Sequence, residues 1–316
     1  MKNDFDLQAL EREAWPLKKK FLKMIEPYRT DLWNYCRKLT RSPWDAEDLV
    51  QETLMKAFAS LGQIWQPLIP KSYLFRIATN TWLNHCRKQQ RIVYSIEENL
   101  MEDEVVSYKF EVQEAIELLV QQLPPRQVVT ILLIDVFDFT ARETAEMLMT
   151  TESAVKSILY RARVKLKSVA EKESNAEETM KQIIPDTAIV NAFIEAFNRR
   201  DPDAMAALFS ENAYNDIVHV GQEFGRETIR NYSIRDTMLD PTITLQTAHY
   251  HTLLGKPVIV MILETESGQY LNEMIYIETE DDKIVYKQDY YFCLDLLAEA
   301  ATELNIPVAE RTYKFD

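Results

Sequence analysis

The sequence predicts a multidomain protein in which two all-α modules, the second with a helix-turn-helix, precede an α+β domain. Apolar residues recur at three- and four-residue spacing over 21–91 and again over 112–169, as in amphipathic helices. Within the second of these stretches, LPPRQ at 123–127 and the pair Thr140 and Glu143 are typical helix starts. Beyond residue 186, helical runs give way to strand-like runs separated by turn residues, at 242–253, 256–266, 270–279 and 283–293.

Length and composition limit the classes of protein to consider. The chain has 316 residues, enough for two or three domains, and only five of them are Gly. No apolar run approaches the roughly 20 residues that span a membrane, so we expect no membrane partner. The N-terminus, MKNDFDLQALERE, carries acids and has no apolar core, so we expect no signal peptide. Three scattered cysteines do not form a disulfide framework, which favours a reducing cytoplasm. Nothing in the sequence indicates a cofactor, and Cys36, His85 and Cys86 lack the paired spacing of a metal site.

The charge of the chain is unevenly distributed. The net charge of −14 argues against a simple nucleic-acid binder, but residues 181–316 hold 11 Lys and Arg against 23 Asp and Glu. Residues 153–167 carry five basic side chains and no acidic one. A local basic stripe is what contact with DNA requires, and this stripe lies in the second helical module.

The first module contains a helix whose start is well marked. Ser42 is a good N-cap, Pro43 follows at the first helical position, and Asp45 stands three residues after the cap. The apolar stripe of this helix predicts a core-facing side, and the opposite side carries Asp48, Gln51 and Glu52. From the residues alone, that polar side is either a solvated surface or a site for a partner.

The run 69–91 combines amides, cations and aromatic rings. A helix from about Lys71 would bury Leu74, Ile77 and Ala78. The polar side chains of the other face suit single-stranded DNA, because amides bond base edges and cations bind phosphates; they are Arg76, Asn80, Asn84, Arg87 and Lys88. Trp65, in the preceding loop, either holds a flipped base or packs in the core.

The helix-turn-helix continues through Thr150 and Thr151 into a second helix. In such motifs the N-terminal residues of the second helix face base edges in the major groove. We therefore expect Ser153, Lys156 and Ser157 to read sequence, and Arg161 and Arg163 to bind phosphate.

Residues 45–53, DAEDLVQET, followed by LPPRQ and a helix-turn-helix, resemble the extracytoplasmic-function sigma factors of bacterial RNA polymerase. The resemblance implies two partners, core RNA polymerase and promoter DNA. It makes 1–20 an extension, 21–91 sigma region 2, 92–111 an acidic linker and 112–169 region 4. It also implies that Asp48, Gln51 and Glu52 contact polymerase, and that the 69–91 segment with Trp65 opens the promoter.

The last third of the chain is expected to comprise a connector (170–185), a domain (186–300) and a tail (301–316). The stretch FIEAFNRRDPDAMAALFSENAYNDI resembles the SnoaL-like cone of the nuclear-transport-factor-two superfamily. Some free-standing cones are enzymes, and five side chains could point into the cavity here: Asp216, His219, His251, Tyr290 and Tyr291. No paired acid and base are visible, so we expect no catalytic activity.

Two functions follow from these resemblances. The first is a promoter-recognition subunit that binds core RNA polymerase, directs transcription initiation and is regulated by its C-terminal cone. The alternative is a bifunctional sigma factor whose cone binds or converts a small-molecule ligand.

Overall fold

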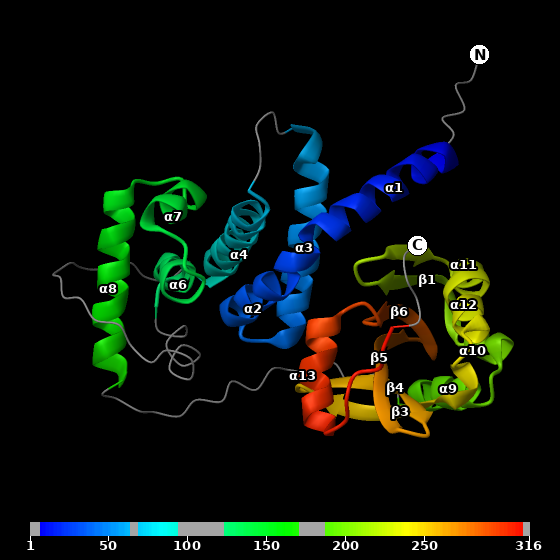
Figure 1. Cartoon of the computed structure of the whole chain (residues 1–316). Coiled ribbons are helices and arrows are strands. Elements are labelled where there is room, and N and C mark those ends of the chain that lie inside the picture. Colours follow the sequence, from blue (N-terminus) through cyan, green and yellow to red (C-terminus); the bar gives the residue numbers. More distant parts are fainter. Residues whose placement is uncertain (1–6, 64–68, 94–122, 171–186, 312–316) are drawn as a thin grey trace, which may run out of the picture. The chain divides into compact units, whose positions relative to one another are not determined.

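The computed structural model describes residues 7–63, 69–93, 123–170 and 187–311. The chain divides into two compact units, Met1–Ala176 and Glu177–Asp316, and each is described by itself. The first is helical and the second contains one sheet, which confirms the predicted fold class (Figure 1). Among the described helices, none is both long and apolar enough to cross a membrane.

The first unit begins with a helix in the segment expected to be an extension. Helix α1 spans Leu7–Ile25, and Phe21 and Ile25 at its end are buried. A short 3-10 turn, Glu26–Tyr28, leads into α2 (Arg29–Thr40), which ends where Arg41 takes the left-handed conformation. Then follow α3 (Pro43–Ser60), the turn Leu61–Gln63 and α4 (Pro70–Val93).

Helix α3 starts where its sequence predicts. The Ser42 hydroxyl accepts a hydrogen bond from the Asp45 amide at 3.2 Å, and Pro43 occupies the first helical position. Its predicted apolar stripe is buried against its neighbours, with Leu49, Val50 and Leu54 at most 5 % exposed. Helices α2 and α4 are joined in this core by a buried bond of 2.7 Å between the Tyr35 hydroxyl and Thr79 Oγ1.

The second helical module consists of α6 (Pro125–Ile131), a π-helical turn (Leu132–Val136), α7 (Ala141–Met147) and α8 (Glu152–Ala170). Thr140 and Glu143 form the predicted capping box at the start of α7. Aromatic rings connect this module to α2 and α4. The Phe137 ring lies 5.3 Å from that of Tyr35 and 5.2 Å from that of Phe75, and Phe139 lies 5.0 Å from Phe75.

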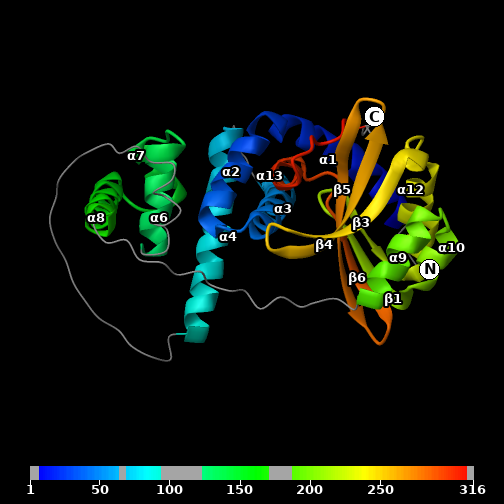
Figure 2. The same ribbon diagram turned by 90° about the horizontal axis from the view of Figure 1, so that it is seen from below.

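The second unit is a six-stranded sheet with helices on both faces (Figure 2). Helices α9 (Thr187–Asn198) and α10 (Pro202–Ala207) precede β1 (Phe209–Ile217) and β2 (Gly221–Phe224). Next come α11 (Arg226–Ile229), a π-helical turn (Arg230–Ile234), α12 (Arg235–Leu239) and the 3-10 turn Ile243–Leu245. The chain continues through β3 (Gln246–Leu253), β4 (Lys256–Thr265), β5 (Gly268–Glu280), β6 (Lys283–Asp289) and α13 (Leu294–Leu304).

The sheet has six strands, two more than the four strand-like runs of the sequence. The strand order is β2-β1-β6-β5-β4-β3, and β1 pairs with β6 in parallel, whereas the other neighbours are antiparallel. The sequence predicts neither β1 nor β2. Burial along β1 is irregular and its pairing shifts register between Phe209 and Tyr214, so its sequence lacks the two-residue alternation that is typical of a strand. The sequence does not predict α13 either, which begins inside the predicted domain and extends into the predicted tail.

The core of the second unit lies between α9, α10 and one face of the sheet. Phe193 and Phe197 of α9 pack there with Ile275 and Ile277 of β5. Side chains on that face are called inward-facing below. Helix α13 covers the opposite face (Figure 2).

Candidate polymerase and promoter interfaces

The predicted polymerase-binding side of α3 is turned away from the core. Asp48 is exposed, and Gln51 and Glu52 are half-buried. Glu52 lies between two bases, with Oε1 2.7 Å from Lys56 Nζ and Oε2 3.0 Å from His85 Nε2 on α4. These two contacts orient the Glu52 carboxylate, and the three residues form one polar surface on consecutive turns of α3.

The predicted promoter-opening residues follow one side of α4. Arg76, Asn84, Arg87 and Lys88 are exposed and Asn80 is half-buried. Their spacing of three and four residues places them on a common helix face. Arg87 Nη1 donates to Asn84 Oδ1 at 2.7 Å, and the Arg76 guanidinium lies 5.9 Å from the centre of the Tyr73 ring. Trp65 lies outside the described residues, as do residues 94–111 of the predicted acidic linker.

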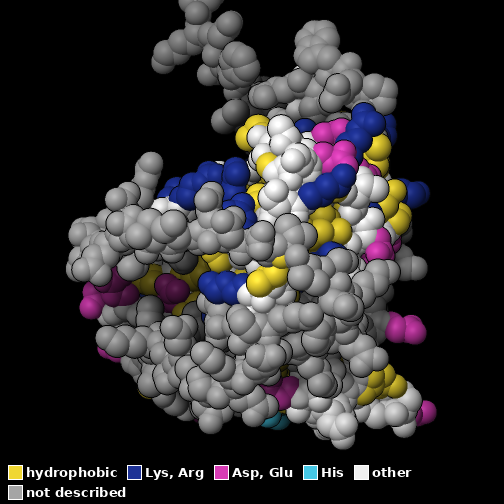
Figure 3. All heavy atoms as spheres, turned by 90° about the vertical axis from the view of Figure 1, so that its left-hand side faces the viewer, with side chains coloured by type: hydrophobic (Ala, Val, Ile, Leu, Met, Phe, Trp, Pro, Cys, Tyr) yellow, Lys and Arg dark blue, Asp and Glu magenta, His cyan; other side chains and the backbone are white. Residues whose placement is uncertain are grey.

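The N-terminal part of α8 presents the predicted base-reading residues to solvent. Ser153, Lys156, Ser157 and Arg161 are exposed, whereas Val155 and Ala162 are buried. Lys156 Nζ lies 2.7 Å from Glu152 Oε1, and this hydrogen bond lowers the pKa of Glu152. Figure 3 views the side on which α8 lies in Figure 1, and Lys and Arg side chains gather in the upper part of that view.

Arg163 makes a contact that its sequence position did not predict. Its Nε and Nη2 donate to the two carboxylate oxygens of Asp135, at 3.1 and 2.5 Å. Asp135 belongs to the π-helical turn that follows α6, 28 positions earlier in the chain. This bidentate pair attaches α8 to the supporting part of the module and engages two of the three guanidinium nitrogens, the edge that a bidentate phosphate contact would use.

Most of the predicted cavity residues of the second unit do not lie on the inward face. Successive side chains of a strand alternate between faces. Asp216 on β1 pairs with Gln288 on β6. Each directly follows an inward-facing residue, so both side chains point to the opposite face of the sheet. Tyr290 donates to Gln288 at 2.6 Å, on that same side, and His251 is exposed.

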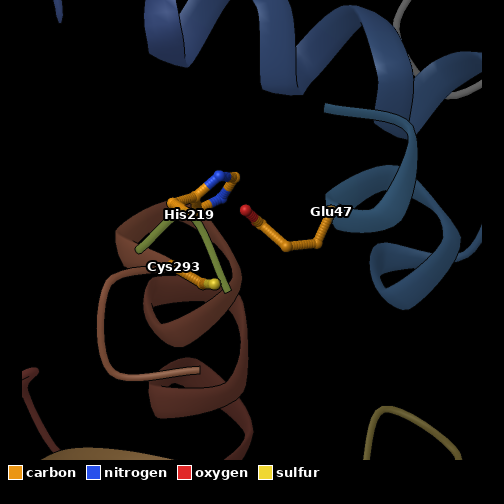
Figure 4. A group of neighbouring side chains, drawn as sticks. All are labelled: Glu47, His219 and Cys293. Atoms are coloured by element: carbon orange, nitrogen blue, oxygen red, sulfur yellow. The ribbon is translucent and has the colours of Figure 1, made fainter. Parts of the chain in front are cut away.

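His219 and Tyr291 lie outside the strands. Figure 4 draws His219, in the turn after β1, with Cys293, which directly precedes α13. Glu47, drawn in the same view, belongs to α3 of the first unit. Within that unit its Oε1 lies 3.5 Å from Arg29 Nη2. Burial, followed by the charge of Glu47, raises the pKa of the Cys36 thiol, which favours its protonated form over a metal-binding thiolate.

The inward face instead carries a polar network that the sequence reading missed. Glu223 accepts from Asn215 Nδ2 at 2.9 Å and from the Ser233 hydroxyl at 2.7 Å. Lys287 Nζ donates to Asp289 and, at 3.5 Å, to Asn215 Oδ1. The two-residue spacing of Lys287 and Asp289 was a usable signal, because it places both side chains on one face of a strand.

Comparison with known proteins covers both helical modules. Residues 24–92 match sigma-70 region 2, and residues 113–166 match sigma-70 region 4. The ECF RNA polymerase sigma factor SigG of Mycobacterium tuberculosis is 30 % identical in an alignment of 223 residues that covers 61 % of this chain. The chain covers 60 % of the length of that relative. SigM of Bacillus subtilis, also described as an ECF RNA polymerase sigma factor, is 25 % identical over 160 residues, 49 % of this chain and 98 % of the relative.

A solved structure of similar extent is that of the extracytoplasmic function sigma factor SigJ of Mycobacterium tuberculosis. It is 16 % identical, with a TM-score of 0.33, and the match covers 85 % of this chain and 95 % of that one. The region 2 match includes the polar side of α3 that carries Asp48, Gln51 and Glu52. The region 4 match includes the exposed N-terminal part of α8. The chain therefore carries sigma-70 region 2 followed by sigma-70 region 4, and it is similar to an ECF RNA polymerase sigma factor over 61 % of its length.

Proposed function

We propose that this protein is a promoter-recognition subunit that binds core RNA polymerase and directs transcription initiation. The observation that carries the proposal is the presence, in one chain, of a region 2 match with an outward polar surface on α3 and a region 4 match with an exposed basic helix. A DNA-binding repressor needs only the second of these.

Each of three surfaces, on α3, α4 and α8, is assigned to a different partner. Asp48, Gln51 and Glu52 on α3 are assigned to polymerase, because their carboxylates and amide offer oriented acceptors to a basic partner surface. The polar face of α4 is assigned to the opened strand. Ser153, Lys156 and Ser157 are assigned to base edges in the major groove, where the start of a recognition helix lies. Arg161 remains a candidate for phosphate, since its side chain is exposed.

The experiment combines the purified protein with core polymerase and maps the start sites of transcripts made from genomic fragments. We expect start sites that share upstream sequence motifs, and we expect none without the protein. Lys156→Ala should relax the preference within the upstream motif, at a cost of about 1–3 kcal/mol in binding if Lys156 contacts a base.

Arg142→Ala is the matched control for that substitution. Arg142 is an exposed base on α7 that pairs with Glu146 at 3.4 Å, as Lys156 pairs with Glu152 on α8. It should leave the preference unchanged. If the protein fails to direct transcription from any fragment while remaining folded, the proposed function is wrong.

The C-terminal domain is proposed to regulate this activity. It carries 23 acidic against 11 basic residues over 181–316 and is covalently attached to the DNA-reading module. Tethering keeps its negative charge at high effective concentration near any DNA that α8 approaches, which disfavours that approach at low ionic strength.

A further inference from the structure

Arg311 is held in place by the segment that follows α13. The Leu271 amide donates to Pro307 O at 2.8 Å and the Ala309 amide to Leu271 O at 2.9 Å, so residues 307–309 add a short strand-like pairing to β5. This pairing brings Arg311 beside β5, where its Nη1 donates to Asn272 O at 2.6 Å. The Tyr291 ring lies 4.3 Å from the guanidinium carbon, and a ring at that distance restricts rotation of the guanidinium.

The other two nitrogens of this guanidinium are buried and make no hydrogen bond of ordinary geometry within the described part of the chain, although the Tyr291 side chain interacts with the guanidinium. They are Nε and Nη2, which together form the edge that a carboxylate fits bidentately. Other arginines in the described part of the chain use the same edge, Arg163 and Arg230 among them. Arg163 holds Asp135 with Nε and Nη2, and Arg230 holds Asp203 with the same pair of atoms. Burying a charged group without its partners is costly, so an unfilled edge indicates a missing anion.

The surroundings of Arg311 suit one carboxylate better than a more highly charged anion. Glu273, an inward-facing residue on β5, acts electrostatically on Arg311. Lys287 and Asp289, which form an ion pair, act in turn on Glu273. Asp240 acts on Glu273 more weakly. Acidic groups so close to the site would repel a phosphate dianion more strongly than a singly charged carboxylate.

We propose that the C-terminal domain contains a binding site for a small organic carboxylate, in which Arg311 Nε and Nη2 clasp the carboxylate and the Glu273 carboxyl provides a second contact. Burial, reinforced by Asp289, raises the pKa of Glu273 to about 8, so at neutral pH this group carries a proton that it can donate. The site is independent of the transcriptional role proposed above.

The test uses the full-length protein and the arginine Nε–H signals of its NMR spectrum at pH 7. Benzoate and acetate are the probes, benzamide and acetamide are their neutral counterparts, and inorganic phosphate represents the other common oxyanion. The Arg311 signal is assigned from its loss in Arg311→Lys. We expect a saturable shift of that signal with a carboxylate, a smaller response to phosphate and none with the amides.

Binding measured by calorimetry supplies the second readout. Arg311→Lys should weaken carboxylate binding about tenfold or more, because an ammonium lacks the fork of two parallel donors. Arg230→Lys is the matched control, since Arg230 uses the same edge on the exposed Asp203, and it should leave affinity within about twofold of the wild type.

Two outcomes would overturn the site. One is the absence of any Arg311 response up to about 50 mM carboxylate, a concentration at which even millimolar affinity would saturate the site. The other is a carboxylate affinity that Arg311→Lys leaves within about twofold of the wild type. That result would show that the carboxylate binds elsewhere on the protein.

Discussion

At Arg163, a single ion pair limits what the side chain can do. The sequence places Arg163 on the basic helix of the helix-turn-helix, and from that position a contact with phosphate was expected. The structure pairs it with Asp135 through two hydrogen bonds, and both side chains are about three-quarters buried, at 26 % and 22 % exposed. We therefore assign Arg163 to holding α8 in place.

A double-mutant cycle tests this assignment. Arg163→Ala and Asp135→Ala should each destabilise the first unit by about 1–3 kcal/mol, and the double variant should cost much less than their sum, because each single change leaves the other charge unpaired. Urea unfolding followed by circular dichroism measures all three. Unchanged stability of Arg163→Ala, with a salt dependence of DNA binding about one unit shallower, would restore the phosphate role.

Glu273 makes the stability of the second unit depend on pH. Its pKa rises from an ordinary value of 4.5 to about 8 on folding, first through burial and then through Asp289, with Lys287 and Arg311 opposing the rise. The folded state therefore binds a proton that the unfolded state has released, so this contribution to stability falls as the pH rises from about 4.5 to 8. Thermal unfolding between pH 5 and 8 should show this slope in the wild type and a shallower one in Glu273→Gln. Equal slopes would mean that Glu273 titrates normally.

Among the elements, α7 depends most visibly on its first residues. It has seven residues, too few for stability by itself, and its start is held by the reciprocal bonds between Thr140 and Glu143, at 3.2 Å and 2.8 Å. The bonded Thr140 amide lowers the pKa of Glu143, so this contribution is present at neutral pH and is lost as the pH falls through the lowered value.

Removing the cap should be measurable by chemical denaturation. Thr140→Ala is expected to cost about 1 kcal/mol of unfolding free energy. Thr150→Ala is the control, because the Thr150 side chain makes no hydrogen bond within the described part of the chain, and its effect should lie within about 0.5 kcal/mol. Equal losses from both substitutions would show that the capping box adds nothing specific.

The polar surface of α3 gives a second prediction for an element. Asp48→Arg, Gln51→Ala and Glu52→Arg should weaken binding to core polymerase while changing stability by only about 0.5 kcal/mol, since none of the three is in the core. Glu52→Arg also removes the pairs with Lys56 and His85, so its effect on stability should be the largest of the three. Binding to core polymerase can be measured by fluorescence anisotropy. If all three variants bind as tightly as the wild type, this side of α3 does not contact polymerase.

For the whole molecule, the uneven distribution of charge predicts how the C-terminal domain acts. Deleting residues 184–316 should raise the affinity for promoter DNA at low salt, and the difference should shrink as salt screens the charges. Changing the exposed Glu264 and Glu266 to Gln should give an intermediate effect in the same binding titrations. A difference that persists undiminished at high salt would point to a mechanism other than electrostatics.

By itself, the sequence determined the two helical modules, the start of α3, the capping box of α7 and the exposure of Asp48, Lys156 and Ser157. These features depend on residues three or four positions apart, whose periodicity and caps act within one turn of a helix. Only the tertiary structure decided the parallel pairing of β1 with β6, the ion pair between Asp135 and Arg163, and the place of Arg311 beside Asn272. Each joins residues between 28 and about 75 positions apart, and no local pattern records such contacts because they form only when distant elements pack.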